Sequence, residues 1–151
     1  MGTDGQAGLS ATELRDLGDI AGTMIPASAE FGVPGADDPA IVADILKSLG
    51  RDLPLVREAL AAIAQKSGGA FAKLSRDDRE ALVDAYYKTG GAPAAALGRV
   101  ILGAYYRDDR VLLSLGLEAR PPFPKGHELE QGDWSLLDRV RARPKLYREV
   151  P

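Results

Sequence analysis

The sequence predicts an all-α protein, an irregular bundle of five or six helices with an extended proline-rich arm at its C-terminal end. Between residues 10 and 116, apolar residues recur three and four positions apart, as on the buried face of a helix. Glycine pairs and single prolines divide this region into pieces of helical length. No segment shows the alternation of apolar and polar residues between tight turns that is typical of strands.

The first helix is predicted from its N-terminal cap. Residues 1–9 read as a flexible lead-in, and Ser10 and Glu13 then have the spacing of a capping box, in which each side chain accepts a hydrogen bond from the other residue's backbone N–H. The helix should end at Pro26. A Pro/Gly-rich loop is expected over residues 26–38.

The later helices are also predicted from caps and breaks. Asp and Ser are favoured N-caps, proline is tolerated in the first turn, and glycine often follows the last turn. The predicted starts are Asp38-Pro39, Asp52 with Pro54, Ser75, Pro93 and Asp108, and the predicted ends are Gly50, Gly68-Gly69, Gly90-Gly91 and Gly116.

Residues 117–151 differ from the helical domain of residues 10–116. They contain five prolines and thirteen charged residues, which is too little apolar content for a core of their own. The prolines of 121–124 impose extended geometry. Asp133 is expected to cap one short helix that Pro144 interrupts. We expect this arm to lie along the helical body or along another protein.

The bulk composition excludes several classes of protein. The chain has no cysteine, so it has no disulfides, thiolate nucleophiles or cysteine-ligated metal sites. It has no apolar run of about 20 residues, so direct membrane insertion is not expected. Arg139, Arg141, Arg143, Lys145 and Arg148 form a basic run, but nucleic-acid modules usually carry a larger positive face.

No residue pattern indicates catalysis. His127 is the single histidine, and with Glu128 and Glu130 it matches no familiar metal-ligand spacing, so we interpret it as a solvated loop residue. The carboxylates at the start of the fourth predicted helix could serve acid–base chemistry, but their position also suits the helix dipole, which explains them sufficiently. These carboxylates are Asp77, Asp78 and Glu80.

Adjacent aromatic residues indicate a surface meant for a partner. In a helix, the members of Tyr86-Tyr87 and of Tyr105-Tyr106 point about 100° apart, so that one ring can enter the core while the other lies at the rim. These pairs alone are explained equally well if they are ordinary tyrosines whose hydroxyls lie in water. Trp134 and Phe123, in the proline-rich arm, have the character of interface anchors.

Several short motifs, taken in order, resemble the gluconate 2-dehydrogenase subunit 3 family. They extend over most of residues 10–148, and each is weak alone. They are the helix that runs into Ile25-Pro26, Phe71-x-x-Leu74-Ser75, Gly103-Ala104-Tyr105-Tyr106-Arg107-Asp108, Leu115-Gly116-Leu117, Pro121-Pro122-Phe123-Pro124-Lys125-Gly126 and Asp133-Trp134-Ser135-Leu136-Leu137-Asp138.

The resemblance implies a small gamma subunit without catalytic residues. Its partner would be a large flavoprotein of the glucose-methanol-choline type, which holds FAD and oxidises a sugar, a glycoside or a related alcohol, sometimes with a cytochrome subunit as well. Many family members begin with a twin-arginine export signal, which residues 1–9 lack. We therefore expect a cytoplasmic protein as numbered, and a periplasmic one if such a signal was removed or if the partner drives export.

The function predicted from the sequence is that of an accessory subunit that binds, stabilises and helps mature this flavoprotein, in a complex such as a heterodimer. The chain itself is expected to hold no catalytic residue, cofactor or metal. The alternatives are a free-standing helical adaptor and, ranked lower, an independent small enzyme. The residues predicted to contact the partner are Tyr105, Tyr106, Pro121, Pro122, Phe123, Pro124, Trp134 and Tyr147.

Overall fold

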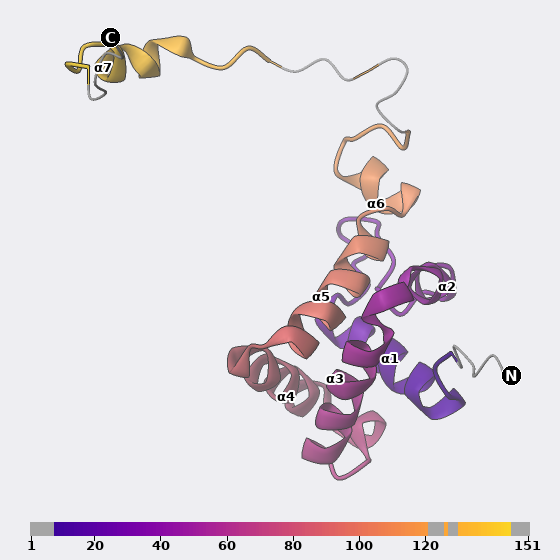
Figure 1. Ribbon diagram of the computed structural model, residues 1–151. Helices are drawn as coiled ribbons and strands as arrows, with labels where there is room; N and C mark the ends of the chain where they lie inside the picture. The colour runs from indigo at the N-terminus through magenta and orange to yellow at the C-terminus, as the bar shows by residue number, and fades with distance from the viewer. Residues whose placement is uncertain (1–7, 121–125, 127–129, 146–151) are drawn as a thin grey trace, which may run out of the picture. The chain divides into compact units, whose positions relative to one another are not determined.

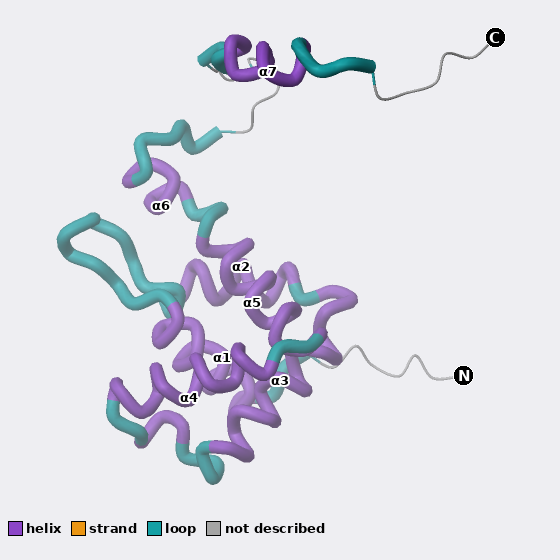
Figure 2. Tube along the Cα trace, turned by 90° about the vertical axis from the view of Figure 1, so that its left-hand side faces the viewer, coloured by secondary structure: helices purple, strands orange, loops and turns teal. Residues whose placement is uncertain are grey.

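A computed structural model describes residues 8–120, 126 and 130–145, and it confirms the all-α prediction. The chain divides into two units, Met1–Ala119 and Arg120–Pro151, which we call the body and the tail. The body holds six α-helices in its described residues, and two short 3₁₀ helices interrupt their succession (Figures 1 and 2). These are α1 (Ala11–Met24), α2 (Pro39–Ser48), η1 (Gly50–Asp52), α3 (Leu53–Lys66), η2 (Phe71–Lys73), α4 (Arg76–Thr89), α5 (Ala92–Tyr105) and α6 (Asp109–Ser114).

Most helix starts are capped by the predicted residues. The capping box at α1 is complete: the Ser10 N–H donates to the Glu13 carboxylate at 2.7 Å, and the Glu13 N–H donates to the Ser10 hydroxyl at 3.3 Å. The carboxylates of Asp38 and Asp108 accept from backbone N–H groups of α2 and α6, each at 2.9 Å. Ser75 caps α4 through the Asp78 N–H.

Helix α3 begins directly after Asp52, as predicted, but it lacks the side-chain cap found at the starts of α1, α2, α4 and α6. Asp52 precedes the helix but makes no capping hydrogen bond, and the short helix η1 joins α2 directly to α3. The Asp52 carboxylate instead accepts two hydrogen bonds from the guanidinium of Arg99 in α5, at 2.9 and 3.1 Å. The Asp52 carboxylate thus binds a guanidinium on another helix and not the backbone N–H groups of α3. The sequence around Asp52 does not indicate this partner.

The core is built around α5. This helix packs against α3 and α2, while α1 packs against α4 and α3. Along α5 most residues are buried, including small ones that allow close approach: Gly98 lies so near Tyr87 of α4 that a Cβ there would meet the ring at 3.4 Å. All buried hydrophobic residues of the described chain lie between Leu17 and Val111, so the core belongs to the body.

In the tail, the structure describes one short helical segment. The 3₁₀ helix η3 (Trp134–Leu137) runs into α7 (Asp138–Arg141), and the predicted cap Asp133 accepts a hydrogen bond from the Ser135 N–H at 3.0 Å. Every residue from 130 to 145 is exposed.

Candidate functional site

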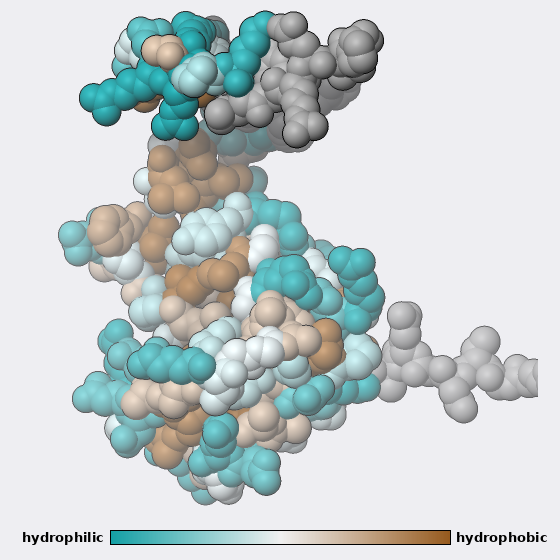
Figure 3. Space-filling view, turned by 60° about the vertical axis from the view of Figure 1, so that its left-hand side comes forward, coloured by the Kyte–Doolittle hydropathy of each residue, from teal (hydrophilic) through white to brown (hydrophobic). Residues whose placement is uncertain are grey.

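The most distinctive surface of the body is an apolar one near the C-terminal end of α5. It comprises large hydrophobic side chains that are mostly exposed, on the loop between α1 and α2, at the end of α5, and on and after α6. We call it the apolar end and define it by Phe31, Tyr106, Leu113, Leu115 and Leu117. Figure 3 shows apolar side chains gathered over α6 and the segment that follows it.

Phe31 lies at the tip of an ordered turn, 68% exposed. Ser28 and Val33 exchange two backbone hydrogen bonds at 3.1 Å across this turn, and Gly32 supplies the positive φ of 64° that the turn requires. The Phe31 N–H also donates to the Ser28 hydroxyl. The turn therefore orders the backbone that presents a large apolar ring to water, and an ordered backbone loses less entropy on binding.

The end of α5 places one tyrosine inside and its neighbour outside. Tyr105 is 5% exposed and Tyr106 is 54% exposed, and their rings meet edge to face with centroids 5.4 Å apart. The Tyr105 hydroxyl donates to the Pro34 carbonyl at 3.3 Å, which ties α5 to the loop that carries Phe31. Tyr105, predicted to contact a partner, therefore supports the apolar end from beneath, whereas Tyr106 is available at the surface.

The short helix α6 is anchored by one buried residue and one arginine. Val111 enters the core, while Leu113 on the same helix stays 61% exposed. The Arg110 guanidinium bridges two helix caps, with the carboxylates of Asp38 at 3.0 Å and Asp108 at 2.8 Å. These contacts tie α6 to the start of α2, while Leu113 stays exposed.

In the tail, the predicted anchor Trp134 is exposed. The other residues of the arm predicted to contact a partner lie outside the described residues. They are Pro121, Pro122, Phe123, Pro124 and Tyr147. Phe31 and the α6 leucines were not singled out from the sequence as contact residues.

Two of the carboxylates considered for catalysis make local contacts in α4. Glu80 pairs with Arg76 of the same helix at 2.8 Å, and Asp78 accepts from the Ser75 hydroxyl at 2.7 Å, so both serve the start of α4. His127 and Glu128 lie outside the described residues, and no group of three or more possible metal ligands occurs among the rest. Burial raises the pKa of Tyr86, Tyr87 and Tyr105, which keeps these phenols protonated.

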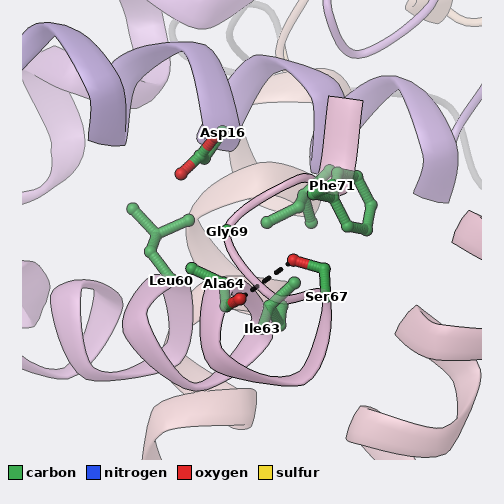
Figure 4. A pocket seen from close by; sticks show the side chains of 8 residues that line it. Asp16, Leu60, Ile63, Ala64, Ser67, Gly69 and Phe71 are labelled. Atoms are coloured by element: carbon green, nitrogen blue, oxygen red, sulfur yellow. Dashed lines mark hydrogen bonds between the residues drawn. The ribbon is translucent and has the colours of Figure 1, made fainter. Parts of the chain in front are cut away.

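Two hollows in the surface of the body differ in size and openness. One small hollow between α1, α3 and η2 measures about 10 Å³, room for about one water molecule (Figure 4). Its walls include Asp16, Leu60 and Phe71, and the Ser67 hydroxyl beside it donates to the Ala64 carbonyl. A wider cleft of about 320 Å³ is open and lined by side chains of both charges, including Asp19 and Arg79.

Comparison with known proteins identifies no relative: no protein-family model matches the chain, and no curated protein or solved structure matches it significantly. No helix in the described part of the chain is long and apolar enough to cross a membrane.

Proposed function

We propose that this chain is the non-catalytic small subunit of an FAD-dependent sugar, glycoside or alcohol dehydrogenase. It binds the large flavoprotein subunit, stabilises it and assists its maturation. The flavin and the catalytic groups belong to the large subunit. The motifs that resemble the gluconate 2-dehydrogenase subunit 3 family support the identity of the partner.

The observation that carries the proposal is the apolar end. Phe31, Tyr106 and Leu113 are held in water by an ordered turn, a buried tyrosine and an anchored helix. Exposed apolar patches are characteristic of protein–protein contact surfaces, and apolar side chains gather over α6 and the segment that follows it (Figure 3). Aromatic residues held in fixed positions are also the usual anchors of such contacts, because little entropy is lost when they bind.

An accessory role follows from what such a surface can do. A large subunit that exposes a matching apolar face while it folds is prone to aggregate, and covering that face removes the hazard. Even an interface of standard size involves about 20–30 residues on each side, more than the five that define the apolar end. We therefore include the tail, with Trp134, in the proposed contact.

The proposal is tested by co-expression with the large-subunit reading frame that neighbours this one. Size-exclusion chromatography recorded at the flavin absorbance should show a yellow complex that contains both chains. The large subunit should be soluble and active only when this chain is present. The double variant Tyr106→Ala/Leu113→Ala should weaken the complex by about 10-fold or more, because both side chains are exposed anchors.

The matched control is Leu46→Ala, which removes an exposed apolar side chain on α2, outside the apolar end. It should leave the complex unchanged. The proposal would be wrong if this chain eluted alone and colourless and the large subunit were fully active without it. A free-standing adaptor or an independent enzyme would then be the better hypothesis.

A further inference from the structure

The helical segment of the tail exposes a concentrated set of apolar side chains. Four large hydrophobic residues lie within seven positions, and each is exposed. They are Trp134, Leu136, Leu137 and Val140. Trp134 is 61% exposed, and as the only tryptophan of the chain it is the strongest single anchor that the protein has to offer.

Local hydrogen bonds shape this segment without a core beneath it. Asp133 accepts from the N–H of Ser135 at 3.0 Å and from its hydroxyl at 2.6 Å, and these bonds lower the pKa of the Asp133 carboxyl. The Ala142 N–H donates to the Asp138 carbonyl at 2.9 Å. Helices this short are marginal in water, so the segment has most to gain from packing against another surface.

Charge separates the two ends of the segment. From residue 138 to residue 145 there are four basic residues, Arg139, Arg141, Arg143 and Lys145, and one carboxylate. That carboxylate, on Asp138, lies 3.4 Å from the Arg141 guanidinium. A complementary surface would therefore receive the apolar side chains at one end and offer negative charge at the other.

We infer that residues 133–145 dock into an apolar groove edged by carboxylates on the large flavoprotein subunit, with Trp134 as the anchor. This inference rests on the proposed function. A protein groove fits better than an anionic bilayer or nucleic acid, because Asp133 adjoins the tryptophan. An anionic surface would repel that carboxylate where the ring is buried, whereas a groove can supply a hydrogen-bond donor.

The test measures the affinity of the full chain for the purified large subunit by biolayer interferometry. Trp134→Ala should weaken binding about 10- to 100-fold, the usual range for a central aromatic anchor. Arg139→Glu/Arg143→Glu should weaken it about 10-fold or more and reduce its dependence on salt. The charge-matched control, Lys66→Glu/Lys73→Glu, changes two exposed lysines of the α3–η2 region and should bind like the unmodified chain.

A second readout follows the tryptophan itself. A chain labelled with 5-fluorotryptophan has one fluorine resonance, which should shift when unlabelled large subunit is added. Unchanged affinity of both tail variants and an unshifted resonance, in a complex that still forms and carries flavin, would overturn the inference but leave the proposed function standing. A membrane surface would be the better assignment if phosphatidylglycerol vesicles bound the unmodified chain but not Trp134→Ala, while Trp134→Ala kept its full affinity for the flavoprotein. That result would overturn the inference. No complex with the unmodified chain would overturn both proposals.

Discussion

Two glycines one turn apart in α1 meet different surroundings. A Cβ added at Gly18 would touch no described atom within 4 Å. A Cβ added at Gly22 would meet Asp37 closely, with the carboxyl carbon at 2.8 Å and the Asp37 Cβ at 3.0 Å. Since the second atom lies close to the backbone, rotation of the carboxylate alone does not relieve the clash. Gly22 therefore allows the loop before α2 to approach α1.

Alanine at these two positions should have opposite effects. Gly18→Ala should raise the free energy of unfolding by about 0.5–1 kcal/mol, because alanine loses less backbone entropy in a helix. Gly22→Ala should lower it by about 1 kcal/mol, because the loop has to move. Urea denaturation of both variants checks the pair, and equal stabilisation by both would show that Asp37 does not pack against α1.

Single residues also mark the limit of what the sequence could predict about the site. Neighbouring residues of a helix are rotated by about 100° about its axis, so the sequence already predicted that one of Tyr105 and Tyr106 could be buried and the other exposed. The exposure of Phe31 did not follow, because a phenylalanine in a Pro/Gly-rich loop is as compatible with the core as with water. Only the hydrogen-bonded turn between Ser28 and Val33 decides its position.

The helix α6 is held in part by a contact distant in sequence. Its cap, Asp108, was evident from the sequence, because a cap and its helix are neighbours. Its tie to α2 was not, since Arg110 and Asp38 are 72 residues apart and one of many possible pairs of opposite charge. The same holds for Asp52, which is diverted from capping α3 by Arg99. Local rules thus predict where helices begin, and tertiary ion pairs decide how they are joined.

The Arg110 bridge makes the stability of α6 depend on pH. Hydrogen bonds from the Arg110 guanidinium lower the pKa of the Asp38 and Asp108 carboxyls below their ordinary value of 3.8. Such groups stabilise the fold fully above their unfolded pKa, and the contribution is lost as the pH falls through the lower folded pKa. The unmodified chain should therefore lose stability below about pH 4.

Arg110→Gln should lower the unfolding midpoint at pH 7. It should also reduce the further loss of stability between about pH 4 and pH 2, because the pKa values of the two carboxyls would then differ less between the folded and unfolded states. Hydrogen exchange should be faster in α6 than in α5. Arg76→Gln, which removes an exposed pair within α4, is the matched control and should change neither quantity much. An Arg110 variant with the pH profile of the unmodified chain would show that the bridge adds nothing to stability.

At the scale of the whole molecule, the buried core of the described residues lies entirely within the body. Every buried hydrophobic residue described lies between Leu17 and Val111, whereas residues 130–145 are all exposed. The low apolar content of the arm predicted a segment without a core, and its described residues have this character. The spacing of apolar residues does not reveal which partner would cover the arm. The proposed identity of that partner therefore rests on motif resemblance alone.

Removal of residues 120–151 should therefore separate folding from the proposed association. The body should unfold within about 2 °C of the full chain, because its core is untouched. The measurement is sensitive enough, since a loss of about 1 kcal/mol would shift the unfolding midpoint of a domain of this size by about 4 °C. The truncated chain should bind the flavoprotein subunit more weakly, since it keeps the apolar end but lacks Trp134. Calorimetry and binding measured on one preparation test both statements. A large fall in the unfolding temperature would mean that the tail stabilises the body, and its exposed side chains would then have to be explained by packing within this chain.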